Sequence, residues 1–256
     1  MLFQDTVFIG IDPPSGEKSL TYAALDQDLN LIAMARGDIS AVSAFAGGQK
    51  STYVAINAPR SLNQGLMKKE SVRNSLSPQP NPGRWTAFRV AEYILRQKNI
   101  RIPNTPATLE SCQGWMKTGF TLYRRLTELG FQVFPANNHP QQLIEVYPHA
   151  AYTVLIKKIP FLKKTLEGRL QRQLLLHSLS VEVPDPMRVF EEFTRYKILR
   201  GDLPLEGLFS VEELEAMIAA YTAWKAAKEP DEITRVGDPK EGEIILPSVD
   251  IKPKYF

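Results

Sequence analysis

The chain has 256 residues, of which 43% are apolar and 23% are charged, and its formal net charge is +3 at pH 7. These values are typical of a globular protein and exclude a disordered, collagen-like or disulfide-rich chain. The one cysteine, Cys112, excludes an internal disulfide and a cysteine-based zinc site, which favours a reducing compartment. The sequence has no apolar run of about 18 residues and no signal-peptide pattern, so we expect a cytoplasmic protein without a membrane span.

The first part of the chain is rich in predicted strands. Residues 6–12 form a continuous apolar run, which is typical of a central strand covered on both faces. The apolar segments 20–25 and 29–35 flank a polar turn, so the first three strands are predicted to form an antiparallel meander. A helix over 39–46 and a buried strand over 52–56 follow.

The middle of the chain is less regular. Residues 58–83 are rich in Pro, Ser and Asn, and we interpret 58–110 as a loop or helical insertion within one domain that spans 1–256. A basic helix is predicted over 84–98. A further helix is predicted over 111–129, with Ser111 as its N-cap and Gly130 as its C-terminal stop.

The last part of the chain alternates predicted strands and helices. The pattern Ser210-Val-Glu-Glu213 is a capping box, so the helix that runs to Lys228 is the most clearly marked element. The order of elements favours an α/β layered fold with a mixed sheet. The other elements predicted here are strands over 131–135 and 142–146, helices after Pro148, over 166–178 and over 186–199, and a late edge strand over 244–246.

Three apolar strands carry a polar side chain at or near their ends. Asp12 ends the first strand, Asn57 follows 52–56, and Glu145 lies within 142–146. Strand ends of layered α/β sheets meet at the ligand crevice. A carboxylate buried there is costly unless it is paired or bound to a metal. Each acid could equally be a turn former or an ion-pair partner, and the sequence leaves both readings open.

The capped helix offers a fourth candidate. Its segment from Leu214 to Trp224 is apolar on nearly all sides, with Glu215 as its one charge. Such a helix is usually buried, so Glu215 needs a partner. Acids that converge from strands and a helix can hold Mg²⁺ or Mn²⁺, and these ions can activate water for phosphodiester cleavage.

A basic stretch between residues 157 and 172 suits phosphate contacts, although such a charge run is more often a solvated face. No catalytic serine elbow, metal-type histidine spacing or Gly-rich phosphate loop is present. The basic residues expected to contact nucleic acid are Lys163, Lys164, Arg169 and Arg172.

Several short motifs, in this order and spacing, resemble the domain-of-unknown-function family 429, predicted nucleases of the RNase H-like superfamily. The resemblance runs from about residue 6 to 247. The motifs are Ile9-Gly-Ile-Asp12, Val54-Ala-Ile-Asn-Ala-Pro59, Ile144-Glu-Val-Tyr-Pro148, Lys163-Lys164 with Gly168-Arg169, Glu212-Glu-Leu-Glu-Ala216 with Ala219-Ala-Tyr-Thr-Ala223, and Val236-Gly-Asp-Pro with Glu241-Gly-Glu-Ile-Ile-Leu-Pro247.

The resemblance implies an RNase H-like mixed sheet of five strands, the first three antiparallel, with helices on both faces. It also implies a metal-assisted attack on nucleic acid, with Asp12, Glu145 and Glu215 as the catalytic acids. The chain departs from the family at Asn57 and Glu215, where members commonly or often carry Asp, and at His149, where some carry Glu. A site with one fewer carboxylate is expected to hold a divalent metal more weakly.

Together these features predict a cytoplasmic nuclease that uses Mg²⁺ or Mn²⁺ and acts on DNA or RNA. The alternative is a nucleic-acid-binding or scaffold protein with weakened or lost catalysis, which Asn57 favours. A third hypothesis is a nucleotide-binding or phosphotransfer protein of the wider superfamily, and the missing Gly-rich phosphate motif argues against it. The expected metal ligands are Asp12, Asn57, Glu145 and Glu215.

Overall fold

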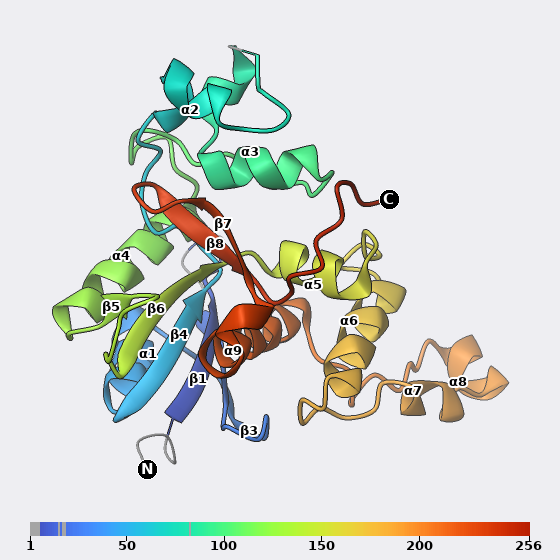
Figure 1. The fold of residues 1–256 in the computed structure, drawn as a ribbon. Coiled ribbons are helices and arrows are strands. Elements are labelled where there is room, and N and C mark those ends of the chain that lie inside the picture. Colours follow the sequence, from blue (N-terminus) through green and yellow to red (C-terminus); the bar gives the residue numbers. More distant parts are fainter. Residues whose placement is uncertain (1–5, 15, 17–18, 82) are drawn as a thin grey trace.

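The computed structural model describes residues 6–14, 16, 19–81 and 83–256. Within them, the strands form one eight-stranded mixed sheet in the order β3-β2-β1-β4-β6-β8-β7, with β5 paired to β6 (Figure 1). The strands are β1 (Thr6–Asp12), β2 (Leu20–Leu25), β3 (Leu31–Gly37), β4 (Ser51–Ile56), β5 (Gln132–Val133), β6 (Gln141–Val146), β7 (Thr234–Asp238) and β8 (Gly242–Leu246).

The pairing confirms the predicted antiparallel meander of β1, β2 and β3. Strand β4 pairs parallel to β1, and β6 pairs parallel to β4. Parallel strands point their carboxyl ends the same way, so the residues that follow β1, β4 and β6 lie at one edge of the sheet. That edge is where Asp12 and Asn57 lie.

The sheet is longer than the five strands that the resemblance implied, because it also contains β5, β7 and β8. The predicted edge position of 244–246 was wrong, since β8 is an inner strand between β6 and β7. Ile244 and Ile245 are buried in different apolar clusters, so β8 is covered on both faces, as inner strands are.

Helices cover both faces of the sheet (Figure 1). The α-helices of the described residues are α1 (Ile39–Gly47), α2 (Glu70–Asn74), α3 (Val90–Gln97), α4 (Gly114–Glu128), α5 (Pro148–Ile156), α6 (Leu166–Ser178), α7 (Arg188–Glu191), α8 (Arg195–Arg200) and α9 (Val211–Lys228). Short 3₁₀ turns occupy Leu66–Lys68, Arg84–Ala87 and Pro230–Glu232. None of these helices combines the length and the apolar character that a membrane span requires.

Three predicted helices differ from the structure at their ends. The segment 84–98 is split into a 3₁₀ turn and α3, because Arg89 is extended and serves as the N-cap of α3. Helix α4 begins after Gln113 rather than Ser111, whose hydroxyl instead pairs with the hydroxyl of Thr108. The segment 186–199 forms two short helices, since Thr194 is extended and caps α8.

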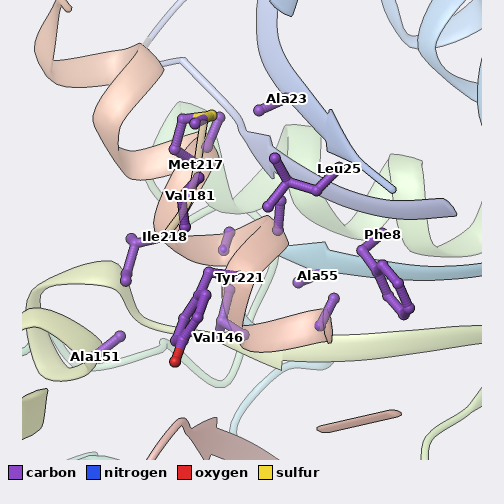
Figure 2. Packing of buried hydrophobic residues seen from close by; sticks show 14 of the residues in the cluster. Phe8, Ala23, Leu25, Ala55, Val146, Ala151, Val181, Met217, Ile218 and Tyr221 are labelled. Atoms are coloured by element: carbon purple, nitrogen blue, oxygen red, sulfur yellow. The ribbon is translucent and has the colours of Figure 1, made fainter. Parts of the chain in front are cut away.

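The core has two main layers, separated by the sheet. Helix α9 packs on one face with α5 and α6, and α1 and α4 pack on the other. Met217, Ile218 and Tyr221 of α9 share one apolar cluster with side chains of the sheet that include Phe8 and Ala55 (Figure 2). Burial of this face explains why α9 is apolar nearly all round, as the sequence predicted.

Segment 58–110 includes α2 and α3, which lie beyond β7 and β8 in Figure 1. Helix α3 packs on that hairpin through Ala91 and Leu95, which share an apolar cluster with Val236 and Leu246. The segment is therefore joined to the main sheet through β7 and β8.

Candidate functional site

Helix α9 crosses β1 with the two backbones in direct contact. A Cβ atom on Gly10 would lie 2.0 Å from the carbonyl oxygen of Ala216 and 2.3 Å from the backbone nitrogen of Ala220. Only glycine fits at such a contact, because a real Cβ needs more than 3 Å. Side chains alternate between the faces of a strand, so Asp12 points to the same side as Gly10. This crossing places Glu215, the residue before Ala216, beside Asp12.

Four side chains meet at this crossing, and we call them the acid cluster: Asp12, Asn57, Glu215 and Lys163. Asn57 Nδ2 donates to Asp12 Oδ1 at 2.7 Å and lies 3.4 Å from Glu215 Oε2. Lys163 Nζ donates to the same Glu215 oxygen at 2.8 Å. The structure therefore brings together three of the four predicted metal ligands and one predicted phosphate-binding residue.

The acid cluster sets two acidic side chains against one ammonium. Burial and, next, the charge of Glu215 raise the pKa of Asp12 to about 7, while Asn57 and Lys163 oppose the shift. Above that pH both acids are ionised and outnumber the ammonium, which is the electrostatic condition for binding a cation. Nearby, burial and the charges of Arg172 and Lys163 lower the pKa of His149 to about 4, so His149 is neutral at pH 7.

The donor set fits a hard divalent cation. Asp12 and Glu215 supply carboxylate oxygens, and Asn57 supplies an amide oxygen once its amide group turns over, which exchanges Oδ1 for Nδ2. Among the described residues, no three His, Cys, Asp or Glu side chains form a metal-binding group.

The structure corrects the expectation for Glu145, which does not join the acid cluster. Leu143 lies in the apolar cluster of the α1 and α4 face, whereas Ile144 and Val146 lie in that of the α9 face. By strand alternation, Glu145 points to the face opposite Asp12. Both of its oxygens are already bound there, by the guanidinium of Arg89 and by the backbone N–H of Arg60 at 2.9 Å.

Glu145 belongs instead to a buried arginine network, which we define as Arg89, Glu92, Glu145 and Glu241. Arg89 is 1% exposed and binds Glu92 Oε1 at 3.0 Å, Glu145 Oε2 at 3.1 Å and the Glu241 carbonyl at 2.9 Å. Burial lowers the pKa of Arg89, but Glu145 and Glu92 outweigh it and leave the pKa raised. The guanidinium is therefore charged at every physiological pH.

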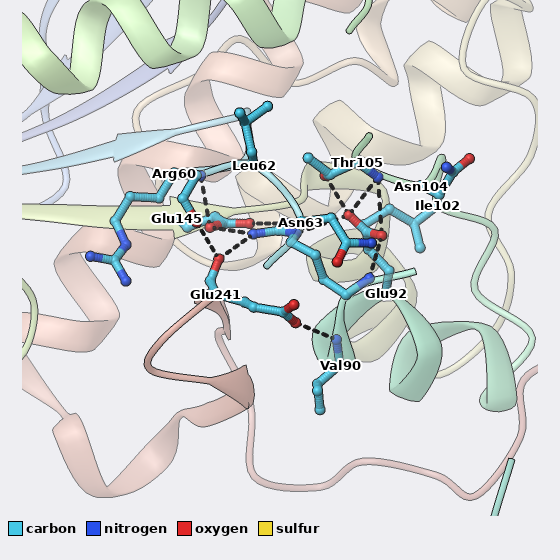
Figure 3. A network of polar contacts seen from close by, with 12 residues as sticks. Arg60, Leu62, Asn63, Val90, Glu92, Ile102, Asn104, Thr105, Glu145 and Glu241 are labelled. Carbon is cyan, nitrogen blue, oxygen red and sulfur yellow. Dashed lines mark hydrogen bonds and ion pairs between the residues drawn. The ribbon is translucent and has the colours of Figure 1, made fainter. Parts of the chain in front are cut away.

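Backbone N–H groups supply the rest of the neutralisation in this network. Glu241 Oε1 accepts from Gln64 and Leu66, each at 3.0 Å, and Glu92 accepts from the N–H of Thr105. Figure 3 shows Glu92, Glu145 and Glu241 gathered from separate segments of the chain. Each carboxylate has its hydrogen bonds inside the protein, which is the signature of a structural network.

The four predicted phosphate-binding residues have different surroundings. Lys164 is exposed, and Lys163 is partly exposed beside Glu215. Arg169 donates to the carbonyls of Leu208 and Phe209, at 2.6 and 2.8 Å. Arg172 is 1% exposed, so the expectation of a phosphate contact is corrected: its guanidinium is inside the protein.

A recess on segment 58–110 lies away from the acid cluster. It measures about 420 Å³, and Asn63, Thr86 and Asn104 are among its lining residues. These polar side chains already form hydrogen bonds within the protein. Both asparagine amides donate to the Ala87 carbonyl, and the Thr86 hydroxyl donates to the Gly83 carbonyl. The acid cluster therefore remains the better candidate site.

The sequence alone does not indicate the arginine network. Arg89 lies in the predicted basic helix over 84–98 and Glu241 in a short motif, and neither position marks a buried ion pair. The spacing of Arg89 and Glu92 allows an ion pair within one helical turn, but nothing local indicates that Glu145 and Glu241, from two other segments, complete it.

Comparison with known proteins places the chain in a family but does not supply an activity. No curated protein and no solved structure matches the chain. One family model, described as a protein of unknown function (DUF429), matches residues 10–241, which include the acid cluster and the arginine network. The chain belongs to the DUF429 family.

Proposed function

We propose that this protein is a metal-dependent nuclease of RNase H-like fold, which cleaves nucleic-acid phosphodiesters at the acid cluster. The observation that carries the proposal is the meeting of Asp12, Asn57 and Glu215 at the carboxyl ends of β1 and β4, where two acids face one ammonium. The strand order and the antiparallel start of the sheet are compatible with this fold.

Each residue of the proposed active site would have its own role in catalysis. A divalent ion held by the oxygens of Asp12, Asn57 and Glu215 would supply Lewis-acid polarisation and an activated water. Asn57 orients the two carboxylates, because its amide lies between them. Burial of Glu215 keeps bulk water from one side of the site. The exposed Lys164 would hold the phosphate backbone of the nucleic acid.

A nuclease assay tests this proposal. We expect the protein to cleave at least one member of a panel of DNA and RNA strands, duplexes and junctions in the presence of Mn²⁺. Asp12→Ala and Glu215→Ala are each expected to lower the rate by roughly 100-fold or more, because each removes a metal ligand. The control is Glu128→Gln, which changes an exposed acid of α4 and should leave the rate unchanged. Equal rates in wild type and Asp12→Ala would contradict the proposal.

A second candidate function is a nucleic-acid-binding protein without catalysis. One observation favours it: the Asn57 amide nitrogen lies within reach of both acids and itself links them. This reading predicts nucleic-acid binding that is unchanged by EDTA, with no cleavage in Mn²⁺. A gel-shift experiment with and without EDTA, followed by the cleavage assay, separates the two functions.

A further inference from the structure

Lys163 reaches the acid cluster from a segment that is fastened to the following helix. Residues 157–164 connect α5 to Thr165, the N-cap of α6. Phe161 is held at both backbone groups: its N–H donates to Gln171 Oε1 at 2.8 Å, and its carbonyl accepts from Arg172 Nη1 at 2.9 Å. The same Arg172 nitrogen donates to the Gly168 carbonyl at 2.8 Å. Arg172 therefore ties the Lys163 segment to α6 instead of contacting solvent.

Gly168 allows the segment to lie this close. A Cβ atom on Gly168 would be 1.9 Å from the Leu162 carbonyl oxygen, a distance that no side chain tolerates. Gly168 and Arg172 lie five and nine residues after Lys163. Gly168 lets the Lys163 segment approach α6, and Arg172 holds the segment there. Both residues therefore help to set the position of the Lys163 ammonium group.

The Lys163 ammonium lies where a metal ion bound by Glu215 would lie. The Glu215 side chain is 5% exposed, whereas that of Lys163 is 46% exposed, so the lysine extends from the solvent side and covers a buried carboxylate. An ammonium at 2.8 Å and a divalent ion cannot occupy the same side of Glu215 Oε2 at once. The ammonium and a divalent ion bound to the same oxygen would also repel each other strongly, because both are positive and the site is partly buried.

We propose that Lys163 is the built-in cation of the acid cluster: a divalent ion must displace it from Glu215, and the released ammonium then pairs with the phosphate of the ligand. The inference rests on the proposed function, because it presumes that the cluster takes a metal. Beyond the proposed function, it assigns two roles to the segment that carries Lys163. The lysine neutralises Glu215 in the metal-free protein, and it supplies a cation for an anionic ligand once the metal is bound.

Titration with Mn²⁺ alone, followed by calorimetry, tests the displacement. Lys163→Gln is expected to bind Mn²⁺ roughly tenfold more tightly than wild type, because both a competitor and a like charge are removed. The matched control, Lys158→Gln, removes an exposed charge of the same connecting segment and should bind as wild type does. A second variant, Gly168→Ala, keeps the lysine but pushes its segment away, so its Mn²⁺ affinity should also rise.

A second titration tests the transfer to phosphate. At saturating Mn²⁺, thymidine 5′-phosphate should bind Lys163→Gln at least fivefold more weakly than wild type, with thermal unfolding as the check on folding. Equal or weaker Mn²⁺ binding by Lys163→Gln would overturn the displacement, and unchanged nucleotide binding would overturn the transfer. If neither wild type nor Lys163→Gln bound Mn²⁺, the metal site of the proposed function would itself fail.

Discussion

At the scale of single residues, Asp12 makes the stability of the protein depend on pH. Its pKa in the folded protein is about 7, whereas an unfolded Asp titrates near 4. The folded state therefore binds the proton more tightly, and the metal-free protein should lose stability as the pH rises from about 4 to about 7. Three pKa units correspond to roughly 4 kcal/mol, which is an upper limit because the Asp12 side chain is only partly buried.

Asp12→Asn should remove this pH dependence. In EDTA, the variant is expected to be more stable than wild type at pH 8, by about 2–4 kcal/mol, and to match it near pH 4. Asparagine keeps an oxygen that can accept the hydrogen bond from Asn57. Urea unfolding at several pH values measures the difference. If wild type instead gained stability relative to Asp12→Asn as the pH rose, the assigned direction of the shift would be incorrect.

Asn57 decides how strongly the acid cluster can hold a metal. Asn57→Asp adds a third carboxylate and removes the amide that joins Asp12 and Glu215. We expect the variant to bind Mn²⁺ roughly tenfold more tightly and to be less stable than wild type in EDTA, because three acids then repel one another. Calorimetry and thermal unfolding measure the two effects. Asn57→Ala, which removes the amide without adding charge, should not bind Mn²⁺ more tightly.

At the scale of elements, the crossing of α9 over β1 brings Glu215 to Asp12. Gly10→Ala would place a methyl group 2.0 Å from the Ala216 carbonyl, so the helix must move. We expect a loss of at least about 3 kcal/mol of stability, together with weaker Mn²⁺ binding. Gly207→Ala is the control, since its nearest atom would be 4.0 Å away. Chemical unfolding of both variants measures the effect, and equal stability of the two would contradict the close crossing.

Helix ends show what local sequence can and cannot indicate. The capping box at Ser210 was read from four residues, and the structure confirms both of its hydrogen bonds. The start of α3 could not be read in this way. Arg89 caps that helix through Glu92, and its guanidinium is bound by Glu145, which lies 56 residues away. Arginine is not among the usual N-cap residues, so no local pattern marks this helix start.

At the scale of the whole molecule, the arginine network fastens segment 58–110 to the sheet. Arg89 lies at the start of α3, Glu145 on β6 and Glu241 before β8. Arg89→Leu would leave buried carboxylates without their cation and should cost about 3–5 kcal/mol. Arg124→Ala, which breaks an exposed pair, should cost less than about 1 kcal/mol. Urea unfolding measures both, and limited proteolysis should show cleavage of Arg89→Leu within 58–110. A small loss for Arg89→Leu would contradict the fastening role.

The sequence by itself determined most of the strands, although not β7, because continuous apolar runs such as Val7–Ile11 have few other ways to be buried. It also determined the long capped helix and three of the four members of the acid cluster, Asp12, Asn57 and Glu215, since a polar residue in or at the end of a buried element must find a partner. Only the tertiary structure decided which face each acid uses. Asp12 ends β1, and Glu145 lies near the end of β6 in the same sheet. Strand alternation nevertheless turns their side chains to opposite faces, that of Asp12 toward Glu215 and that of Glu145 toward Arg89. That choice depends on contacts between distant segments, which no local pattern encodes.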